Sequence, residues 1–284
     1  MKLSYFPGCS LGSTAKEYDM SARIACQALG MDLVELNDWV CCGATSAHST
    51  NHLLSVALPS RNVALAQETG LDLAIPCSAC YSRVKKADYV LRNDDDMRKE
   101  IESIVDFKYN GNINVVSLLE AITNQIGTDA IAKRVQKPLT GLKVVCFYGC
   151  LLVRPPKVTN FDNPENPMSM DRIVKALGAE PIPWSYKTDC CGANLGLTST
   201  KVVQGMVNRL IEAAKEVEAM AIVTSCPLCQ SNLEMRRKER GTDLPAFYFT
   251  ELIGLALGLK ETKKWLNLHL INPNPLLQSL SLAD

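Results

Sequence analysis

Ten of the twelve cysteines form one pattern that occurs twice. Each copy has a lone cysteine, then a Cys-Cys-Gly segment and then a Cys-x-x-Cys segment. The first copy comprises Cys9, Cys41, Cys42, Cys77 and Cys80, and the second comprises Cys150, Cys190, Cys191, Cys226 and Cys229. Thiolates at such short spacings bind zinc or iron–sulfur centres, so the pattern predicts two metal centres in one chain.

The spacing of the two copies indicates a tandem duplication. The Cys-Cys pair and the Cys-x-x-Cys segment are separated by 34 residues in both copies, and all four cysteines recur at an offset of 149. Between the lone cysteine and the pair lie 31 residues in the first copy and 39 in the second. The extra length falls in a proline-containing stretch, residues 155–167, which is typical of an inserted loop. We therefore expect two domains, residues 1–140 and 141–284.

Composition excludes several functional classes. The chain has 284 residues, of which 47% are hydrophobic, with 30 basic and 30 acidic side chains. This balance gives no basic surface for nucleic acid or anionic membranes. The longest apolar runs, such as residues 252–259, are far too short for a transmembrane segment, and the N-terminus lacks an export signal. We expect a cytoplasmic protein, in which a disulfide framework is disfavoured.

Short apolar runs alternate with helical patterns in each half, which predicts an α/β fold of two Rossmann-like domains with parallel sheets, related by a pseudo-twofold axis. In the first half we expect strands over 2–6, 32–36 and 71–75, and helices over 15–29 and 49–67, the latter with a break at Pro59. In the second half we expect strands over 143–147 and 221–224, helices over 170–177 and 200–219, and a further helix beginning near Pro227.

The cysteines follow the predicted strands. In open α/β sheets, ligands bind at the carboxyl ends of the strands, so the five cysteines of each half can converge there. Helix N-termini at this edge favour thiolates. Gly43 and Gly192, next to the Cys-Cys pairs, fit the same edge because a glycine lets the backbone turn and donate its N–H to sulfur; simple helix capping is the alternative.

The number of cysteines narrows the type of metal centre. Structural zinc takes four ligands, and a cubane cluster takes one cysteine for each of four irons. Five converging thiolates therefore indicate either one spectator cysteine or an iron–sulfur cluster that is not a simple cube. Zinc remains the alternative. Two like centres, with neither a catalytic triad nor a phosphate loop beside them, favour redox chemistry.

The doubled pattern, from Phe6-Pro7-Gly8-Cys9 to Cys226-Pro227-Leu228-Cys229, resembles the duplicated cysteine-rich (CCG) domain found in the catalytic iron–sulfur component of heterodisulfide reductase from methanogenic archaea, its B subunit. The resemblance implies a noncubane [4Fe-4S] cluster in each half, held by the five repeated cysteines of that half. It also implies reduction of the coenzyme M–coenzyme B disulfide to two thiols, with one sulfur captured at each cluster. We expect the substrate pocket between the halves.

Partner proteins are expected because the chain lacks both a ferredoxin signature and a dinucleotide-binding loop. The resemblance implies a ferredoxin-like C subunit and a flavin-containing A subunit. One alternative is a CCG electron-transfer subunit of a succinate:quinone or lactate/glycolate oxidoreductase. Another is a zinc-containing assembly subunit without catalytic activity.

Several residues beyond the ligands are candidates for the site. His48 and His52 are four residues apart, and we interpret His48 as a candidate proton donor. Anionic groups on the substrate would require nearby cations; the candidates are Arg83, Lys85, Arg154, Lys157, Lys187 and Lys201. Cys26 and Cys146 are expected to pack in the core. Trp39 and Trp184 are expected to pack beside the Cys-Cys loops and shield them from water.

Overall fold

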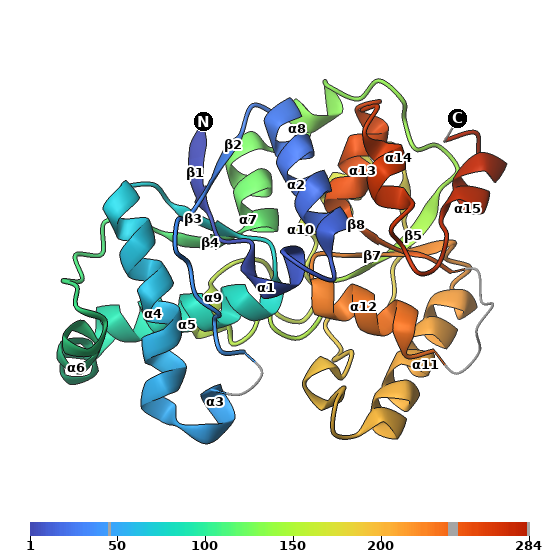
Figure 1. Ribbon diagram of the computed structural model, residues 1–284. Coiled ribbons are helices and arrows are strands. Elements are labelled where there is room, and N and C mark those ends of the chain that lie inside the picture. The colour runs from blue at the N-terminus through green and yellow to red at the C-terminus, as the bar shows by residue number, and fades with distance from the viewer. Residues whose placement is uncertain (45–46, 238–243, 283–284) are drawn as a thin grey trace.

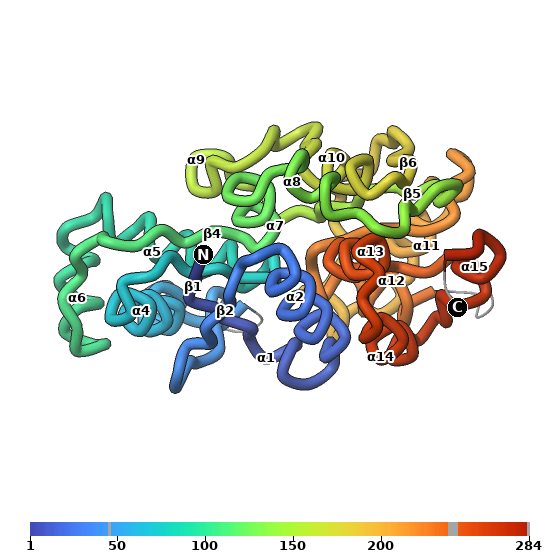
Figure 2. Tube along the Cα trace, turned by 90° about the horizontal axis from the view of Figure 1, so that it is seen from above, coloured from blue at the N-terminus to red at the C-terminus, as the bar shows by residue number. Residues whose placement is uncertain are grey.

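Two four-stranded parallel sheets make up the computed structural model, which describes residues 1–44, 47–237 and 244–282. The strand orders are β2-β1-β3-β4 and β6-β5-β7-β8, so each strand of the first sheet has its counterpart in the second. Figures 1 and 2 show the two sheets side by side, each with its own helices. The predicted α/β class and the duplication are confirmed.

The elements of the first half are β1 (Lys2–Tyr5), α1 (Gly8–Leu11), α2 (Lys16–Ala28), β2 (Asp32–Glu35), α3 (Ala47–Thr50), α4 (His52–Thr69), β3 (Leu73–Ile75), α5 (Ser78–Asn93), α6 (Asp95–Val105), β4 (Val115–Ser117), α7 (Leu118–Ala121), the π-helical η1 (Ile122–Ile126) and α8 (Thr128–Ala132). Those of the second half are β5 (Lys143–Phe147), α9 (Pro156–Thr159), α10 (Ser169–Ala176), β6 (Glu180–Pro181), the 3-10 helix η2 (Ala193–Leu195), α11 (Thr200–Glu216), β7 (Ala221–Thr224), α12 (Pro227–Met235), β8 (Ala246–Tyr248), α13 (Phe249–Ala256), α14 (Thr262–Leu266) and α15 (Asn274–Ser279).

Most predicted strands and helices agree with these bounds to within a few residues, but the expected break at Pro59 is wrong. Pro59 lies inside α4, which is continuous from His52 to Thr69. The interruption comes earlier, at Asn51, whose side chain caps α4 by accepting a hydrogen bond from Leu54 N at 2.9 Å. A side-chain cap of this kind satisfies an otherwise unpaired backbone N–H and so fixes where the helix begins.

The inner strands β3 and β7 are buried along their whole length, as expected for parallel strands covered by helices on both faces, and so is the edge strand β8. The edge strand β2 is largely exposed. The apolar core therefore forms around the inner strands, and their carboxyl ends are held firmly in place.

The two halves pack through reciprocal contacts. The helix that leads into the second strand of each half contacts the helix after the last strand of the other half: α2 contacts α13, and α10 contacts α7. Figures 1 and 2 both show α2 beside α13. At this contact the Tyr18 ring stacks on Tyr248 with centroids 4.0 Å apart, and the Ser21 and Thr250 hydroxyls lie 2.7 Å apart. Reciprocity of this kind is expected for halves related by a pseudo-twofold axis.

Candidate functional site

All ten repeated cysteines lie at strand ends or in the loops and first helical turns that follow the strands. Cys9 is in α1, directly after β1, and Cys150 comes three residues after β5. Cys77 and Cys226 are the N-cap residues of α5 and α12. The carboxyl edge of each sheet thus carries the cysteines of its own half, as the order of strands and cysteines in the sequence predicts.

The sulfur geometry is nearly the same in the two halves. Cys42 Sγ lies 3.2 Å from Cys80 Sγ, and in the second half the equivalent Cys191 Sγ lies 3.3 Å from Cys229 Sγ. These contacts bring the Cys-Cys segment and the Cys-x-x-Cys segment of each half to one site. Within residues 1–44, 47–237 and 244–282, no three Cys, His, Asp or Glu side chains are arranged around a single-ion site.

Backbone N–H groups point at the thiols that begin each Cys-Cys pair. Gly43 N donates to Cys41 Sγ at 3.4 Å, and Gly192 N donates to Cys190 Sγ at 3.3 Å. A hydrogen bond from Cys150, together with the Gly192 N–H, lowers the pKa of Cys190 to about 6 despite its partial burial. Donors aimed at sulfur stabilise the thiolate, which is the form that binds metal.

Two glycines leave room for sulfur at the end of the first strand of each half. A Cβ added to Gly8 would lie 3.0 Å from Cys80 Sγ, and one added to Gly149 would lie 3.2 Å from Cys229 Sγ. Both glycines have a positive φ, which is strained for other residues. The space beside these sulfurs is therefore open only because glycine has no side chain. The thiols of each half are a donor set that fits a thiolate-bound cluster.

A cavity in the second half is lined by all five of its repeated cysteines. Tyr148, Gly149, Leu151 and Leu228 complete much of the wall, but Ser78 and Ala79 come from the first half. The cavity therefore lies where helix α5 of one half meets the cysteine loops of the other. This position agrees with the expectation of a pocket between the halves.

The two Cys-x-x-Cys segments meet at the interface. The thiols of Cys77 and Cys226 hydrogen-bond to each other, which raises the pKa of Cys77 and helps to lower that of Cys226. Next to them, Tyr18 donates its hydroxyl to two carbonyls that precede these cysteines, Pro76 O at 3.2 Å and Ser225 O at 3.1 Å. One tyrosine thus holds both segments, and the two cysteine sets form one composite site.

His48 lies at the rim of the first-half site. It is in α3, partly buried, and its Nδ1 is enclosed without a hydrogen-bond partner among the described residues. Burial and the charges of Arg83 and Lys86 lower its pKa, so the imidazole is neutral at pH 7. His52, the first residue of α4, is exposed.

The six candidate cations differ in their surroundings. Arg83 is half-buried and interacts with the charge of the Cys42 thiolate. Lys85 Nζ donates to Val115 O at 2.7 Å. Arg154 is held by Pro164 O, Glu165 and Thr188 in the inserted loop. Lys157 is exposed above the Tyr89 ring, and Lys201 is exposed near the start of α11.

Lys187 differs from the other five because it is buried. Its Nζ lies 2.8 Å from Asp171 Oδ1 and 2.9 Å from Pro167 O, and both charged side chains are almost fully enclosed. Tyr148 donates a further hydrogen bond to Asp171 at 2.6 Å. Lys187 is thus a structural residue that holds the inserted loop to the second half, rather than a cation available to a substrate.

The remaining candidates pack as the sequence suggests. Cys26 and Cys146 are fully buried in the core. Trp39 packs edge-on against Phe6 with centroids 5.4 Å apart, and Trp184 packs in the same way against Phe147 at 6.1 Å. The duplication therefore extends to an aromatic pair beside each Cys-Cys loop.

Two asparagines that were not predicted for the site hold the Cys-Cys loops in place. The Asn62 side chain makes hydrogen bonds of 3.0 and 2.9 Å to the N and O of Val40, next to Cys41. Asn232 donates from its amide to Cys191 O at 3.0 Å. The sequence does mark the position of Asn232. The offset of 149 makes it the counterpart of Arg83, which we predicted for the site.

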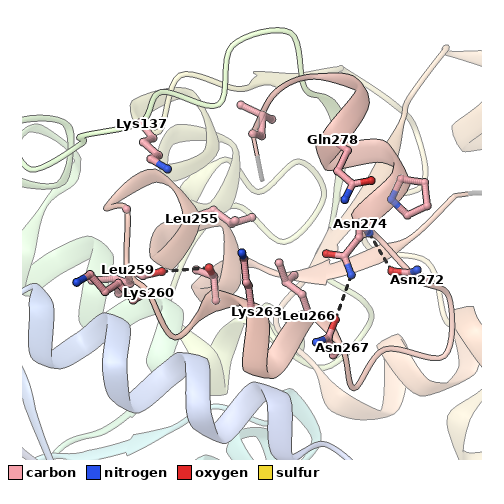
Figure 3. Close-up of a pocket in the computed structure, with 14 residues that line it drawn as sticks. Lys137, Leu255, Leu259, Lys260, Lys263, Leu266, Asn267, Asn272, Asn274 and Gln278 are labelled. Atoms are coloured by element: carbon pink, nitrogen blue, oxygen red, sulfur yellow. Dashed lines mark hydrogen bonds between the residues drawn. The ribbon is translucent and has the colours of Figure 1, made fainter. Parts of the chain in front are cut away.

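A second pocket lies among the C-terminal helices (Figure 3) and shares no residue with the cysteine cavity. Lys137, Lys260 and Lys263 line it together with polar side chains. Hydrogen bonds within its wall, such as Asn274 Nδ2 to Asn267 Oδ1 at 3.1 Å, tie α14 to α15. No residue that we predicted for the functional site lies in this pocket.

Comparison with known proteins agrees with this duplicated geometry. The CCG cysteine-rich domain matches the chain twice, over residues 3–85 and 144–234. The chain belongs to the CCG family. The two CCG matches contain all ten repeated cysteines and end before the last strand of each sheet, β4 or β8.

Several relatives of this CCG protein align along nearly their whole length. The 8-methylmenaquinol:fumarate reductase membrane anchor subunit of Wolinella succinogenes is 33% identical, covering 97% of this chain and 99% of the relative. The B subunit of the ferredoxin/F420H2-dependent CoB-CoM heterodisulfide reductase of Methanosarcina acetivorans is 29% identical, covering 90% and 89%. Lactate utilization protein A of Macrococcus caseolyticus is 22% identical, covering 89% and 96%.

The CCG fold also resembles a solved structure. A hypothetical protein from Helicobacter pylori superposes with a TM-score of 0.77 at 13% identity; the match covers 95% of this chain and 52% of that one. In the part of the CCG chain that the structure describes, no helix has the length and apolar character needed to span a bilayer.

Proposed function

We propose that this CCG protein is the catalytic iron–sulfur subunit of a heterodisulfide reductase. The single observation that carries the proposal is the meeting of two five-cysteine sets at one interface, where Ser78 and Ala79 of the first half line the cavity of the second-half cysteines. The relative from Methanosarcina acetivorans, named as part of a CoB-CoM heterodisulfide reductase, supports it. The two domains are residues 1–140 and 141–284.

The proposed cofactors are two noncubane [4Fe-4S] clusters, one in each half. Each would be held by the lone cysteine, the Cys-Cys pair and the Cys-x-x-Cys pair of that half: Cys9, Cys41, Cys42, Cys77 and Cys80 in the first, and Cys150, Cys190, Cys191, Cys226 and Cys229 in the second. A donor set made only of thiolates suits iron–sulfur clusters. Close backbone N–H groups at Cys41 and Cys190 support thiolate ligation.

The reaction consumes one disulfide, two electrons and two protons, and it yields two thiols. The clusters, when bound, would supply the electrons one at a time. The chain would hold the disulfide between its halves, so that each sulfur faces one cysteine set. Ser78 of the first half and Tyr148, Leu151 and Leu228 of the second line the cavity in which the disulfide would lie. The proposed substrate is the coenzyme M–coenzyme B disulfide.

Among side chains, Arg83 and Lys201 are the cations that we propose to attract the anionic groups of the substrate. Arg83 lies on α5, the helix of the first Cys-x-x-Cys segment, and Lys201 lies on α11, which follows the second Cys-Cys pair in the sequence. Neither is held in a described salt bridge. Lys85, Arg154 and Lys157 are secondary candidates, because each already contacts another group. His48 is the proposed proton donor; because its pKa is lowered, it must take up each proton shortly before passing it on.

Electrons would reach the site through a ferredoxin-like C subunit, which takes them from a flavin-containing A subunit in a cytoplasmic complex. A second candidate function is an electron-transfer subunit of a quinone-linked reductase. The relative from Wolinella succinogenes favours it, because that protein is named as a fumarate reductase membrane anchor and is 33% identical.

Anaerobic purification followed by metal analysis and electron paramagnetic resonance (EPR) tests the proposal. We expect iron and acid-labile sulfide in equal amounts, close to eight of each per chain for two four-iron clusters. Adding coenzyme M to the oxidised protein should change the EPR spectrum. A preparation that contains only zinc would overturn both candidate functions. Clusters that ignore coenzyme M but are reduced by a menaquinol would favour the quinone-linked role.

A further inference from the structure

The two cysteine sites are built alike, but three positions around the first site differ in charge from their counterparts in the second half. Three positions near the first-half site carry basic side chains, and the offset of 149 that relates the cysteines also relates these positions to three uncharged residues. The pairs are His48 and Leu197, Arg83 and Asn232, and Lys86 and Met235.

Arg83 is a basic residue whose charge interacts with a thiol of the first-half site. It lies on α5 three residues after Cys80, which places both side chains on the same face of the helix. The guanidinium is half-buried, and its Nε is enclosed without a hydrogen-bond partner among the described residues. Its charge acts on Cys42, whose Sγ is 3.2 Å from Cys80 Sγ.

The second half has a neutral amide at the equivalent place. Asn232 lies on α12 three residues after Cys229, it is 8% exposed, and its amide donates to Cys191 O at 3.0 Å. Leu197 and Met235, the counterparts of His48 and Lys86, are 95% and 62% exposed and carry no charge. The same thiol set is therefore held in two different electrostatic surroundings.

We infer that Arg83 makes the two centres electrically unequal, so that the cluster of the first half is reduced more readily than the cluster of the second. The inference rests on the proposed function, because it assumes a cluster at each cysteine set. Reduction adds negative charge to a cluster, and a fixed cation nearby stabilises the reduced form. Partial burial keeps solvent from screening this effect. Arg83 would not bind the cluster itself; its charge would act on the cluster through the thiolates that hold it.

An EPR-monitored redox titration of the anaerobically purified full-length chain tests the inference. Exchanging the equivalent residues gives two matched variants, Arg83→Asn and Asn232→Arg. We expect Arg83→Asn to lower the equilibrium constant for reduction of one cluster by at least about tenfold. This change is a fall in the midpoint potential of about 59 mV for one electron. Asn232→Arg should raise the midpoint potential of the other cluster. Because each variant should shift the potential of a different cluster, the two variants together assign each EPR signal to one half.

Further variants separate charge from structure. Arg83→Lys keeps the charge and should retain most of the difference in potential, whereas Lys86→Met removes a more distant charge and should have a smaller effect. If Arg83→Asn does not fold with full iron, Asn232→Arg and Arg83→Lys still test the effect. Two clusters with unchanged potentials in Arg83→Asn and Asn232→Arg would overturn the inference and leave the proposed function intact. Absence of any iron–sulfur signal from the wild-type chain would overturn both.

Discussion

The hydroxyl groups of Ser78 and Ser225 lie 3.4 Å apart, although they belong to different halves and 147 positions separate them in the sequence. Each is next to the first cysteine of a Cys-x-x-Cys segment: Ser78 follows Cys77, and Ser225 precedes Cys226. A shift of one half relative to the other would therefore move the two cysteine sets apart. The interface between the halves sets the geometry of the composite site.

Removing one ligand should empty one site and spare the other. In Cys42→Ala and in Cys191→Ala, we expect the iron content to fall by about half, because in the proposed function each half would bind its own cluster through its own thiolates. Iron and sulfide analysis with EPR measures the loss. Cys26→Ala is the matched control: it removes a buried thiol outside the two sets and should retain all the iron. Full iron in both ligand variants would contradict the assignment.

Gly8→Ala should displace the sulfur of Cys80 and weaken cluster binding in the first half. The added Cβ would lie 3.0 Å from Cys80 Sγ, and the positive φ adds strain of about 1–3 kcal/mol. Gly70→Ala is the control, because Gly70 also has a positive φ but has nothing within 4 Å of an added Cβ. Both variants should unfold at lower denaturant concentration than the wild type. Only Gly8→Ala should lose iron; equal iron in the two would rule out the steric effect.

Stability should fall as the pH rises above 7, because of a buried charge cluster around His269. Its ring contacts Glu234 at 3.1 Å and Glu251 at 2.9 Å, and all three side chains are fully enclosed. Burial opposes protonation, but the two carboxylates outweigh it and raise the pKa of His269 from 6.5 to about 11. The folded state then binds this proton more tightly than the unfolded state. Its stabilisation is complete below pH 6.5 and is lost progressively as the pH rises to about 11.

Urea unfolding at pH 7.5, 8.5 and 9.5 measures this slope. The range lies above the pKa of Glu17, which burial raises to about 7, so that the nearby Glu17 carboxyl contributes little to the change. His269→Ala leaves two buried carboxylates without their cation and should destabilise the fold by about 3–5 kcal/mol at pH 7.5. The variant should also flatten the dependence on pH. An unchanged slope would mean that other groups titrate in this range.

Lys187→Met should reduce stability without a specific effect on one cluster. It leaves the Asp171 carboxylate buried without its ammonium partner, at a cost of about 3–5 kcal/mol. In the double variant Lys187→Met/Asp171→Leu both charges are gone, and much of the stability should return. Thermal unfolding of the three proteins checks this order. If Lys187→Met kept its stability but bound the disulfide substrate more weakly, Lys187 would contact substrate after all.

The sequence predicted those parts of the site that depend on local order. Each cysteine follows a short apolar strand, and parallel strands end at one edge, so convergence within a half could be inferred from the positions of Cys9, Cys77, Cys150 and Cys226. The break expected at Pro59 was wrong because packing holds α4 together across the proline, whereas the Asn51 cap determines where α4 begins.

Contacts between the halves could not be predicted in the same way. Nothing in the local pattern of Tyr18 shows that its hydroxyl reaches Ser225 in the other half. Likewise, a lysine is usually exposed, and nothing in the sequence near Lys187 indicates that it is buried beside Asp171. Such contacts depend on which helix faces meet, and spacing along the chain carries little information about that.

The reciprocal packing of α2 on α13 and of α10 on α7 is the arrangement found in a symmetric homodimer. The fused chain is thus a dimer whose two halves can never separate, since the linker holds each half at high effective concentration beside the other. A permanent tether also frees the two halves from having identical sequences. That freedom is what allows one half to carry Arg83 where the other carries its counterpart Asn232, an asymmetry that no homodimer of a single gene product could acquire.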